Sequence, residues 1–359
     1  FGQFDVIVTT YGTARARLST ITEHEYSVMV IDEAQAIKTI TTAVSKAMRE
    51  VKADYRIAMS GTPVENRLLE YFSILDFANR GLFGSAKSFH KNFAKPIEEN
   101  HDPTAVDRFK RLTAPFIMRR LKSDKAIIAD LPDKLTSDQF CTLTQQQAAI
   151  YQAVVNETMT FIEQCNDPNM RRALVLKLIQ QLKAICNSPA QFDASGKYQP
   201  EDSGKVERLF ELLQDITDAN GKALIFTQSV VMGKILQNLI EERFERKPDF
   251  LYGGLSRSER MDMVDDFQND PSNRFLLLSL KAAGTGLNLT AANNVIHFDL
   301  WWNPAVENQA TDRAYRIGQR NKVQVYRFIC ANTFEERINA MIQSKRDLAD
   351  LTVTAGESW

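Results

Sequence analysis

Short apolar segments that alternate with longer amphipathic ones constrain the fold of this chain more than any other feature. In the second half of the chain, apolar runs predict strands at residues 223–227, 250–252, 275–279, 295–298 and 324–329. Segments with helical spacing of apolar residues separate them, at residues 205–217, 230–243, 257–267 and 305–315, and a closing helix is expected from Phe334. This alternation predicts a parallel α/β sheet, whose ligands bind at the carboxyl ends of the strands.

The first part of the chain shows the same alternation on a smaller scale. Strands are predicted at residues 5–9, 28–31 and 56–59, and apolar residues follow at helical spacing from Leu68 to Phe77. From about residue 85 to residue 192 the strand signals disappear, and the pattern is helical and charged. A loop rich in Gly, Pro, Ser and Asp is predicted at residues 187–203.

These segments predict an α/β protein with two parallel-sheet domains and helical insertions between them. The expected boundaries are residues 1–84 for the first domain, 85–202 for the insertions and linker, 203–345 for the second domain and 346–359 for a C-terminal tail. A chain of 359 residues is long enough for each domain to bury a core. Because Phe1 begins inside a predicted strand, we expect the chain to be part of a longer protein.

Composition excludes several classes of protein. Apolar residues make up 44% of the chain and charged residues 25%, and no apolar run approaches the roughly 20 residues that span a bilayer. We therefore expect an aqueous cellular compartment and no membrane partner. The four cysteines form no C-x-x-C pair, which argues against a metal site and predicts reduced, mostly buried thiols. A formal net charge of -1 means that binding to nucleic acid would depend on a local basic groove.

Two adjacent carboxylates follow the predicted strand at residues 28–31. The run V-I-D-E-A-Q places Asp32 and Glu33 at the end of this strand, with Gln35 close behind. In a P-loop ATPase, an aspartate in this place holds the Mg²⁺ that bridges the phosphates, and a neighbouring acid can orient the attacking water. The alternative is an acidic turn in which Asp32 caps a helix. The motif by itself does not decide between the two.

Small and hydroxylated residues follow two other predicted strands. Ser60, Gly61 and Thr62 come after the strand at residues 56–59, within reach of the same crevice, although Gly-Thr-Pro is also a common turn. The segment SLKAAGTGLN, residues 279–288, opens from a very apolar strand with many backbone N–H groups available. Such a loop can hold a phosphate, although a glycine-rich strand exit is common without any ligand.

Three polar side chains share one face of the helix that is predicted before residue 315. Gln309, Arg313 and Arg316 stand at i, i+4 and i+7. The arginine fork fits phosphoryl oxygens, and an arginine from a second domain can stabilise the charge on a transferring phosphoryl group. The alternative is a solvated basic face paired with Asp312 and Glu307.

Taken together, these pieces resemble the Swi/Snf branch of the superfamily-two helicases, and in particular its bacterial members. The matching stretches are VTTYGT (residues 8–13), DEAQAIK (32–38), SGTPVENRLLEYFSILDF (60–77), PFIMRRLKSD (115–124), KALIFTQ (222–228), SLKAAGTGLNL (279–289) and FDLWWNPAVENQATDRAYRIGQ (298–319). In the step CNSP, residues 186–189, members of the branch usually have histidine before the proline. The resemblance implies two RecA-like lobes, the first truncated at its N-terminus, that close on ATP and Mg²⁺ and step along double-stranded DNA.

The resemblance also implies a role for individual residues. Asp32 resembles the acid that holds Mg²⁺, Glu33 the residue that orients water, and Arg313 and Arg316 the arginine fingers. Residues implied at the nucleotide, or in coupling it to DNA, are Gln35, Ser60, Gly61, Thr62, Gly284, Gly286 and Gln309. Residues implied on the DNA strand, where backbone phosphates carry no sequence information, are Thr10, Tyr11, Gln228, Arg260, Ser279, Lys281, Thr285, Trp302 and Asn303.

The partners that the resemblance implies are duplex DNA, bound without sequence preference, and DNA-bound proteins such as transcription or nucleoid proteins. We expect a monomer that works on the nucleoid of a bacterium, or in the nucleus if the source is eukaryotic.

One motif of the branch is missing from the sequence. The P-loop reads G-x-x-x-x-G-K-[ST], whereas the Gly-Lys pairs of this chain are followed by Tyr198, Val206, Ala223 and Ile235. We attribute the difference to truncation, and we expect the chain alone not to hydrolyse ATP.

Two alternative functions come from other classes. The first is a DNA-binding scaffold without hydrolysis, which has no need for Asp32, Glu33, Arg313 and Arg316 together. The second is a strand-separating helicase, which is expected to stack bases on aromatic side chains. No wedge is obvious in the sequence, although Trp301 and Trp302 leave this question open.

Overall fold

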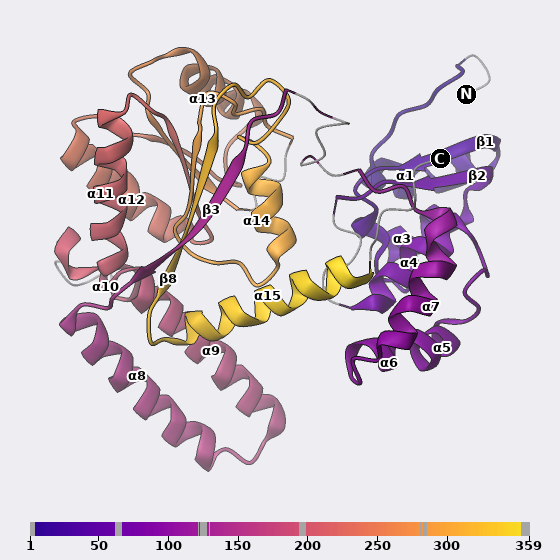
Figure 1. The fold of residues 1–359 in the computed structure, drawn as a ribbon, viewed down its shortest axis with the longest axis horizontal. Helices are drawn as coiled ribbons and strands as arrows, with labels where there is room; N and C mark the ends of the chain where they lie inside the picture. Colours follow the sequence, from indigo (N-terminus) through magenta and orange to yellow (C-terminus); the bar gives the residue numbers. More distant parts are fainter. Residues whose placement is uncertain are drawn as a thin grey trace. The chain divides into compact units, whose positions relative to one another are not determined.

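The computed structural model describes residues 4–61, 67–120, 122, 128, 130–193, 199–280, 282 and 286–352, with side chains as far as Ser344. The chain folds into two compact units, Phe1–Arg120 with Ser344–Trp359, and Leu121–Gln343 (Figure 1). Each unit contains a parallel β-sheet, as the sequence predicts. None of the described helices combines the length and the apolar character that a membrane span requires.

The sheet of the first unit consists of two parallel strands, β1 (Glu25–Ile31) and β2 (Lys52–Ala58). One face packs on helices through Ile31, Ala34 and Phe77. The other face is exposed: Tyr55 is 70% exposed and its neighbour in register, Val28, is 51% exposed. The helices nearest to this sheet are α1 (Tyr11–Ala16), α2 (Leu18–Thr22), the 3-10 helix η1 (Ala34–Ile37), α3 (Ala43–Glu50) and α4 (Leu68–Ala78).

A second core in the first unit is built from aromatic rings. Helix α4 confirms the helical spacing predicted from Leu68 to Phe77. The ring of Phe89 is fully buried, 5.5 Å from that of Phe93 and 5.8 Å from that of Phe109. The helices that carry this core are α5 (Ala86–Phe89), the π-helical turn η2 (His90–Ala94), α6 (Lys95–Glu98), α7 (Pro103–Thr113) and the 3-10 turn η3 (Ala114–Phe116).

The strand predicted at residues 5–9 is wrong. Residues 5–9 have no regular structure, and Val8 is 91% exposed. Strands β1 and β2 pair only with each other in the described part of the chain. Without a neighbouring strand, the backbone of an apolar segment has no ladder to join, whatever its β propensity.

The second unit contains a six-stranded parallel sheet in the order β3-β8-β7-β4-β6-β5. The strands are β3 (Lys134–Cys141), β4 (Ala223–Thr227), β5 (Asp249–Leu251), β6 (Phe275–Ser279), β7 (Asn294–His297) and β8 (Val323–Cys330). The five strands predicted in this region are all present. Their carboxyl ends meet at one edge, where the polar motifs of the sequence lie.

Strand β4 shows why the central strands are apolar without interruption. Leu224 and Phe226 belong to one core, which also contains Phe267, whereas Ala223 and Ile225 belong to the core on the opposite face. Helices α11 (Gly204–Asp218) and α12 (Val230–Phe244) supply the Ile225 core, and α13 (Arg257–Asn269) and α14 (Pro304–Thr311) supply the other. A parallel strand with helices on both faces is buried on both faces.

Strand β3 was not predicted, because the sequence from residue 85 to residue 192 was interpreted as helical. β3 lies at the edge of the sheet and pairs only with β8. Most of its side chains are exposed, including Leu135 at 52% and Phe140 at 59%, so its sequence has no apolar run. An edge strand is specified by its partner more than by its own pattern.

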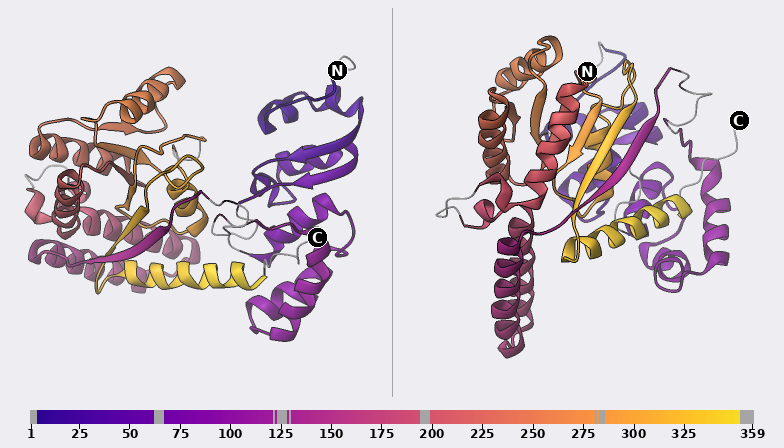
Figure 2. Two further views of the ribbon diagram at one scale, coloured as in Figure 1. Left: turned by 45° about the horizontal axis from the view of Figure 1, so that its top comes forward. Right: turned by 60° about the vertical axis from the view of Figure 1, so that its left-hand side comes forward.

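The rest of that region is helical, as predicted. Helices α8 (Gln145–Gln164) and α9 (Pro168–Asn187) lie side by side as a long hairpin (Figure 2). The loop predicted at residues 187–203 contains the end of α9, the short helix α10 (Pro189–Phe192) and the 3-10 turn η4 (Pro200–Asp202). The closing helix is α15 (Phe334–Thr352).

Candidate functional site

The two carboxylates predicted at the end of β1 lie on an exposed edge of the first sheet. The backbone N–H of Met59 donates to the carbonyl of Ile31 at 2.8 Å, and Ala34 N–H donates to the Met59 carbonyl at 2.9 Å, so the two strand ends are tied together. Asp32 and Glu33 follow at this point, and both are exposed. Glu33 has φ 49°, in the left-handed region, which turns the chain sharply into η1.

The side chain of Gln35 joins the ends of the two strands. Its amide nitrogen donates to the carboxylate of Glu33, and its amide oxygen accepts from the hydroxyl of Ser60 at 2.8 Å. Gly61 is exposed beside them, and Thr62 lies outside the described residues. The structure therefore brings together Glu33, Gln35 and Ser60, which the sequence placed in one crevice.

Tyr11 approaches the same carboxylates from α1. Its hydroxyl donates to the backbone carbonyl of Asp32 at 2.6 Å. Partial burial, together with the negative charges of Asp32 and Glu33, raises the pKa of Tyr11 from 10.0 to about 12. The neighbouring Thr10 caps α1 by accepting from the Thr13 N–H at 3.1 Å. Tyr11 thus stays neutral beside the acids, and Thr10 has a local structural role.

The donor set at this edge fits a hard divalent cation. Asp32 and Glu33 present exposed carboxylate oxygens, the ligand type that Mg²⁺ takes together with substrate phosphates. One oxygen of Asp32 accepts the Glu33 N–H at 2.8 Å, a contact that orients the carboxylate without burying it.

At the edge of the second sheet, the loop after β6 contacts a turn that carries the two arginines. Ser279 is buried, and its hydroxyl accepts from Ala282 N–H at 3.3 Å. Gly286 has φ 70°, a conformation that favours glycine. The Leu289 N–H donates to the Arg313 carbonyl at 3.0 Å. Lys281, Gly284 and Thr285 lie outside the described residues.

The predicted helical face that was to carry Gln309, Arg313 and Arg316 is wrong. Helix α14 ends at Thr311, and residues 312–318 form turns, so only Gln309 is helical. Arg313 is half-buried, whereas Arg316 is exposed and its guanidinium donates to the Leu287 carbonyl at 3.4 Å. The two arginines therefore lie beside the loop at residues 286–289.

Buried Gln319 explains why the chain turns instead of continuing the helix. Its amide nitrogen donates to the carbonyls of Thr290, Ala292 and Ala314, at 3.1, 2.8 and 3.1 Å. Its amide oxygen accepts from the N–H groups of residues 320 and 321. Gly318, with φ 99°, provides the left-handed conformation that the turn requires.

Lys122 also stabilises the turn at residues 312–318. Its ammonium lies 2.9 Å from the Asp312 carboxylate and donates to the Tyr315 carbonyl at 3.1 Å. The sequence assigned no role to Lys122 or Gln319, although both stand in stretches that carry the resemblance.

The remaining residues predicted on the DNA strand have visible structural partners. Asn303 caps α14 by accepting from Ala305 N–H at 3.0 Å, and Trp302 packs against the buried cluster that contains Leu300 and Ile329. The guanidinium of Arg260 donates to the Gly253 carbonyl at 3.4 Å. Gln228 lies at the end of β4, and its side-chain amide donates to the Leu300 carbonyl.

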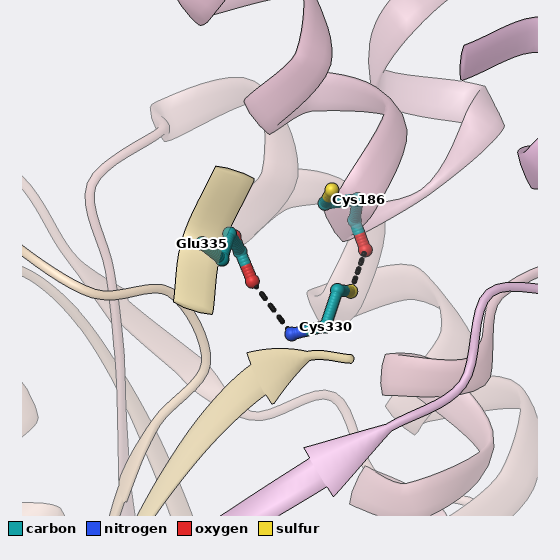
Figure 3. A group of neighbouring side chains, drawn as sticks. All are labelled: Cys186, Cys330 and Glu335. Carbon is teal, nitrogen blue, oxygen red and sulfur yellow. Dashed lines mark hydrogen bonds between the residues drawn. The ribbon is translucent and has the colours of Figure 1, made fainter. Parts of the chain in front are cut away.

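The four cysteines are free thiols and three of them are buried, as predicted. In the described residues, Cys186, Cys330 and Glu335 bring possible metal-ligand atoms within 4.8 Å of one another (Figure 3). Both Glu335 oxygens are occupied, one by Lys205 at 2.9 Å and one by the Cys330 N–H at 2.8 Å. The Cys330 thiol donates to the Cys186 carbonyl at 3.3 Å, and this environment raises its pKa. A buried ammonium beside a thiol whose pKa is raised does not fit a cation site.

The chain has two parallel sheets. Carboxylates lie at the edge of the first sheet, and a glycine-containing loop and the turn with Arg313 and Arg316 lie at the edge of the second. This combination defines a RecA-like protein of the helicase class. The chain belongs to the SNF2-related family. The model of the SNF2-related domain matches residues 1–191, and that of the helicase conserved C-terminal domain matches residues 204–318. These matches confirm the resemblance that the motifs carry.

Individual relatives match along nearly the whole chain. The Bacillus subtilis (strain 168) protein named "Putative ATP-dependent helicase/translocase YwqA" is 43% identical over 99% of this chain and 38% of its own length. An uncharacterized ATP-dependent helicase of Mycoplasma pneumoniae is 36% identical over 97% of this chain and 33% of its own length. The chain thus spans between 33% and 38% of the length of these relatives.

A solved structure, the Sulfolobus solfataricus SWI2/SNF2 ATPase core in complex with dsDNA, is 43% identical. The match covers 99% of this chain and 75% of the chain in that structure, with a TM-score of 0.55. The two-lobe RecA-like fold expected from the sequence is therefore the fold of this family.

Proposed function

We propose that the protein containing this chain is an ATP hydrolase that moves along double-stranded DNA and remodels protein–DNA complexes on its path. The observation that carries the proposal is the bridge at the first sheet, in which Gln35 ties Glu33 to Ser60. Glu33 is exposed and yet held in one orientation, as a residue that aligns an attacking water must be. Family membership and the DNA complex of a similar ATPase core support the same function.

In the proposed chemistry, Asp32 would hold Mg²⁺ and Glu33 would orient a water for attack on the bound nucleotide. When bound, Mg²⁺ neutralises the charge that develops on the phosphates. Arg313 and Arg316 of the second unit would stabilise the negative charge on the phosphates, and Gln309 and Gly286 would contribute to nucleotide binding. We propose that the bond between Gln35 and Ser60 couples this site to DNA. The hydrogen bond from Tyr11 to the Asp32 carbonyl connects the site to a residue assigned to DNA.

In the proposed contact with DNA, Tyr11 and Gln228 bind the backbone phosphates. Thr10 and Asn303, which cap helices, and Trp302, which packs on a buried cluster, would support them. A motor that follows the backbone meets bound proteins whatever the sequence beneath them. We therefore propose that DNA-bound proteins, rather than base pairs, are its obstacles.

Displacement of a third strand from duplex DNA tests this proposal. The full-length protein, with Mg²⁺ and ATP, should release a triplex-forming oligonucleotide without separating the duplex, and Glu33→Gln should abolish release while ATP still binds. Separation of a forked duplex at a comparable rate would favour a strand-separating helicase instead. Tight DNA binding without DNA-stimulated phosphate release would favour the scaffold.

A further inference from the structure

A buried carboxylate lies at the carboxyl edge of the central strands of the second sheet. Asp299 follows β7 and is 0% exposed. Its Oδ1 accepts from Gln228 N–H at 2.9 Å, and its Oδ2 accepts from the Thr227 hydroxyl at 2.8 Å and the Asn187 amide at 3.0 Å. A buried carboxylate with three donors has one stable position. Asp299 therefore fixes the backbone where β4 ends and Gln228 begins.

The side chain of Gln228 is held by the residue next to Asp299. Its amide nitrogen donates to the Leu300 carbonyl, which also accepts from the Lys183 ammonium at 2.5 Å. Burial lowers the pKa of Lys183, and the nearby Asp299 carboxylate opposes this shift. Both the backbone and the amide of Gln228 are thus positioned by residues 299 and 300.

Asn187, the last residue of α9, connects Asp299 to a buried ion pair. Its amide oxygen accepts from the Lys205 ammonium at 3.2 Å, while its amide nitrogen faces Asp299. This orientation is dictated by chemistry, since an ammonium only donates and a carboxylate only accepts. Lys205, at 0% exposed, pairs with Glu335 at 2.9 Å, and Glu335 also holds Cys330 (Figure 3).

The result is a continuous buried polar chain from Glu335 through Lys205, Asn187 and Asp299 to Gln228. Its members come from α15, α11, α9 and the ends of β7 and β4. Apolar residues of similar volume would often be as stabilising as a buried ion pair, whereas a satisfied polar network specifies one geometry. The arrangement is therefore suited to positioning, and the residue at its outer end is Gln228.

We propose that Asn187 and Asp299 are positioning residues that set Gln228 for contact with duplex DNA. The CNSP step at the end of the helical hairpin thereby controls how tightly the second lobe holds the DNA backbone. The inference rests on the proposed function, because it takes Gln228 as a residue that follows the DNA strand.

The test uses the full-length protein and a labelled random-sequence duplex, with affinity measured by fluorescence anisotropy and turnover by DNA-stimulated ATPase. Asn187→Leu should weaken binding by about tenfold, the effect of one misplaced hydrogen bond, and raise the DNA concentration for half-maximal turnover by a similar factor. Turnover at saturating DNA should fall by less than about twofold, because the ATP site is not altered.

Thr227→Val tests the same link in case Asn187→Leu does not fold. This change keeps the shape of the side chain and removes one of the three donors to Asp299. It should weaken DNA binding in the same direction. The matched control is Gln191→Ala, because Gln191 accepts from the same Asn187 amide at 2.9 Å without touching Asp299. Its DNA affinity should equal that of the parent.

A double-mutant cycle tests whether the loss of DNA affinity in Asn187→Leu depends on Gln228. In a Gln228→Ala background, which should itself bind DNA more weakly, Asn187→Leu should cause little further loss. Equal losses in both backgrounds, or a loss of melting temperature without loss of affinity, would overturn the inference and leave the proposed function intact. If the parent does not bind duplex DNA, the proposed function fails, and the inference fails with it.

Discussion

The two sheets are both parallel, but they differ in how far the side chains at their edges are buried. The first has two strands, one exposed face and an edge where short-range hydrogen bonds link the exposed Asp32 and Glu33 to the half-buried Gln35. The second has six strands, a central strand buried on both faces and an edge held by the fully buried Asp299 and Lys205. Exposed groups can meet a ligand, whereas buried groups can only position others. The first edge therefore presents exposed acids to a ligand, whereas the second combines Arg313 and Arg316 with buried residues that position others.

The largest expected effect concerns the arginine turn of the second unit. If Arg313 and Arg316 stabilise charge that develops during phosphoryl transfer, alanine at either position should lower turnover of the full-length protein by about 10³ or more, with little change in ATP affinity. Lysine should not restore turnover, because it lacks the planar fork. The measurement is DNA-stimulated turnover beside ATP affinity. Normal turnover in both alanine variants would leave the chemistry to the exposed acids of the first sheet.

The buried ion pair gives the next largest effect. Lys205→Met leaves Glu335 buried without its cation and should destabilise the protein by about 3 to 5 kcal/mol in urea unfolding. The double variant Lys205→Met with Glu335→Gln should recover much of that loss. Lys52 and Glu25 of the first unit, 3.4 Å apart with side chains 65% and 80% exposed, provide the matched control. Lys52→Met should change stability by less than about 1 kcal/mol. Similar losses for both lysines would contradict the contrast between buried and exposed edges.

Substitution of one isoleucine in each sheet compares how much side-chain burial contributes to the stability of the two sheets. Ile225 in β4 is 0% exposed and Ile57 in β2 is 49% exposed. Ile225→Ala should lower the free energy of unfolding by about 2 to 5 kcal/mol, and Ile57→Ala by a fraction of this, because the exposed side chain leaves no cavity. Chemical unfolding of both variants measures the difference. A large loss for Ile57→Ala would mean that its face is covered in solution.

The smallest effect concerns Tyr11 beside the acids of the first sheet. Its pKa of about 12 in the folded chain lies above the ordinary value of 10.0. Below pH 10 both states keep the proton; as the pH rises from 10 toward 12 the unfolded chain ionises first, so stability falls over that window. Tyr11→Phe should remove this part of the decline. Phenolate absorbance of the parent minus that of the variant isolates the titration of Tyr11, and a midpoint near 10 would contradict its burial beside Asp32 and Glu33.

Much of the fold could be predicted because local patterns specify it. Strands β4 and β6 were predicted with their observed bounds, since four consecutive apolar residues followed by a hydroxyl residue describe a strand that is buried on both faces. The segment at residues 5–9 and strand β3 were misjudged for opposite reasons. The first is apolar but finds no partner among the described residues, and the second is polar but pairs with β8. Pairing depends on which segments meet, and a single segment does not contain that information.

The candidate site, like the fold, could be predicted from the sequence only in part. Adjacent residues such as Asp32 and Glu33, and the order of the motifs, were sufficient to predict the acids and the class of protein. The turn that carries Arg313 and Arg316 was not predictable from i, i+4 spacing, because Gln319 captures the carbonyls of Thr290 and Ala292 and ends the helix early. A buried amide needs hydrogen-bond partners, and here the carbonyls that it binds lie at the turn and at residues distant in sequence.

The sequence by itself determined the α/β class, the parallel strands of the second sheet and the family to which the chain belongs, because these depend on periodicity and on short motifs. Only the tertiary structure decided how Gln35 joins Glu33 to Ser60 and how Asn187 joins Lys205 to Asp299. Residues 187 and 299 stand far apart in the chain, and neither has a neighbour in sequence that indicates its partner. A buried polar group needs a partner to offset its lost hydration, and packing of the whole domain selects that partner.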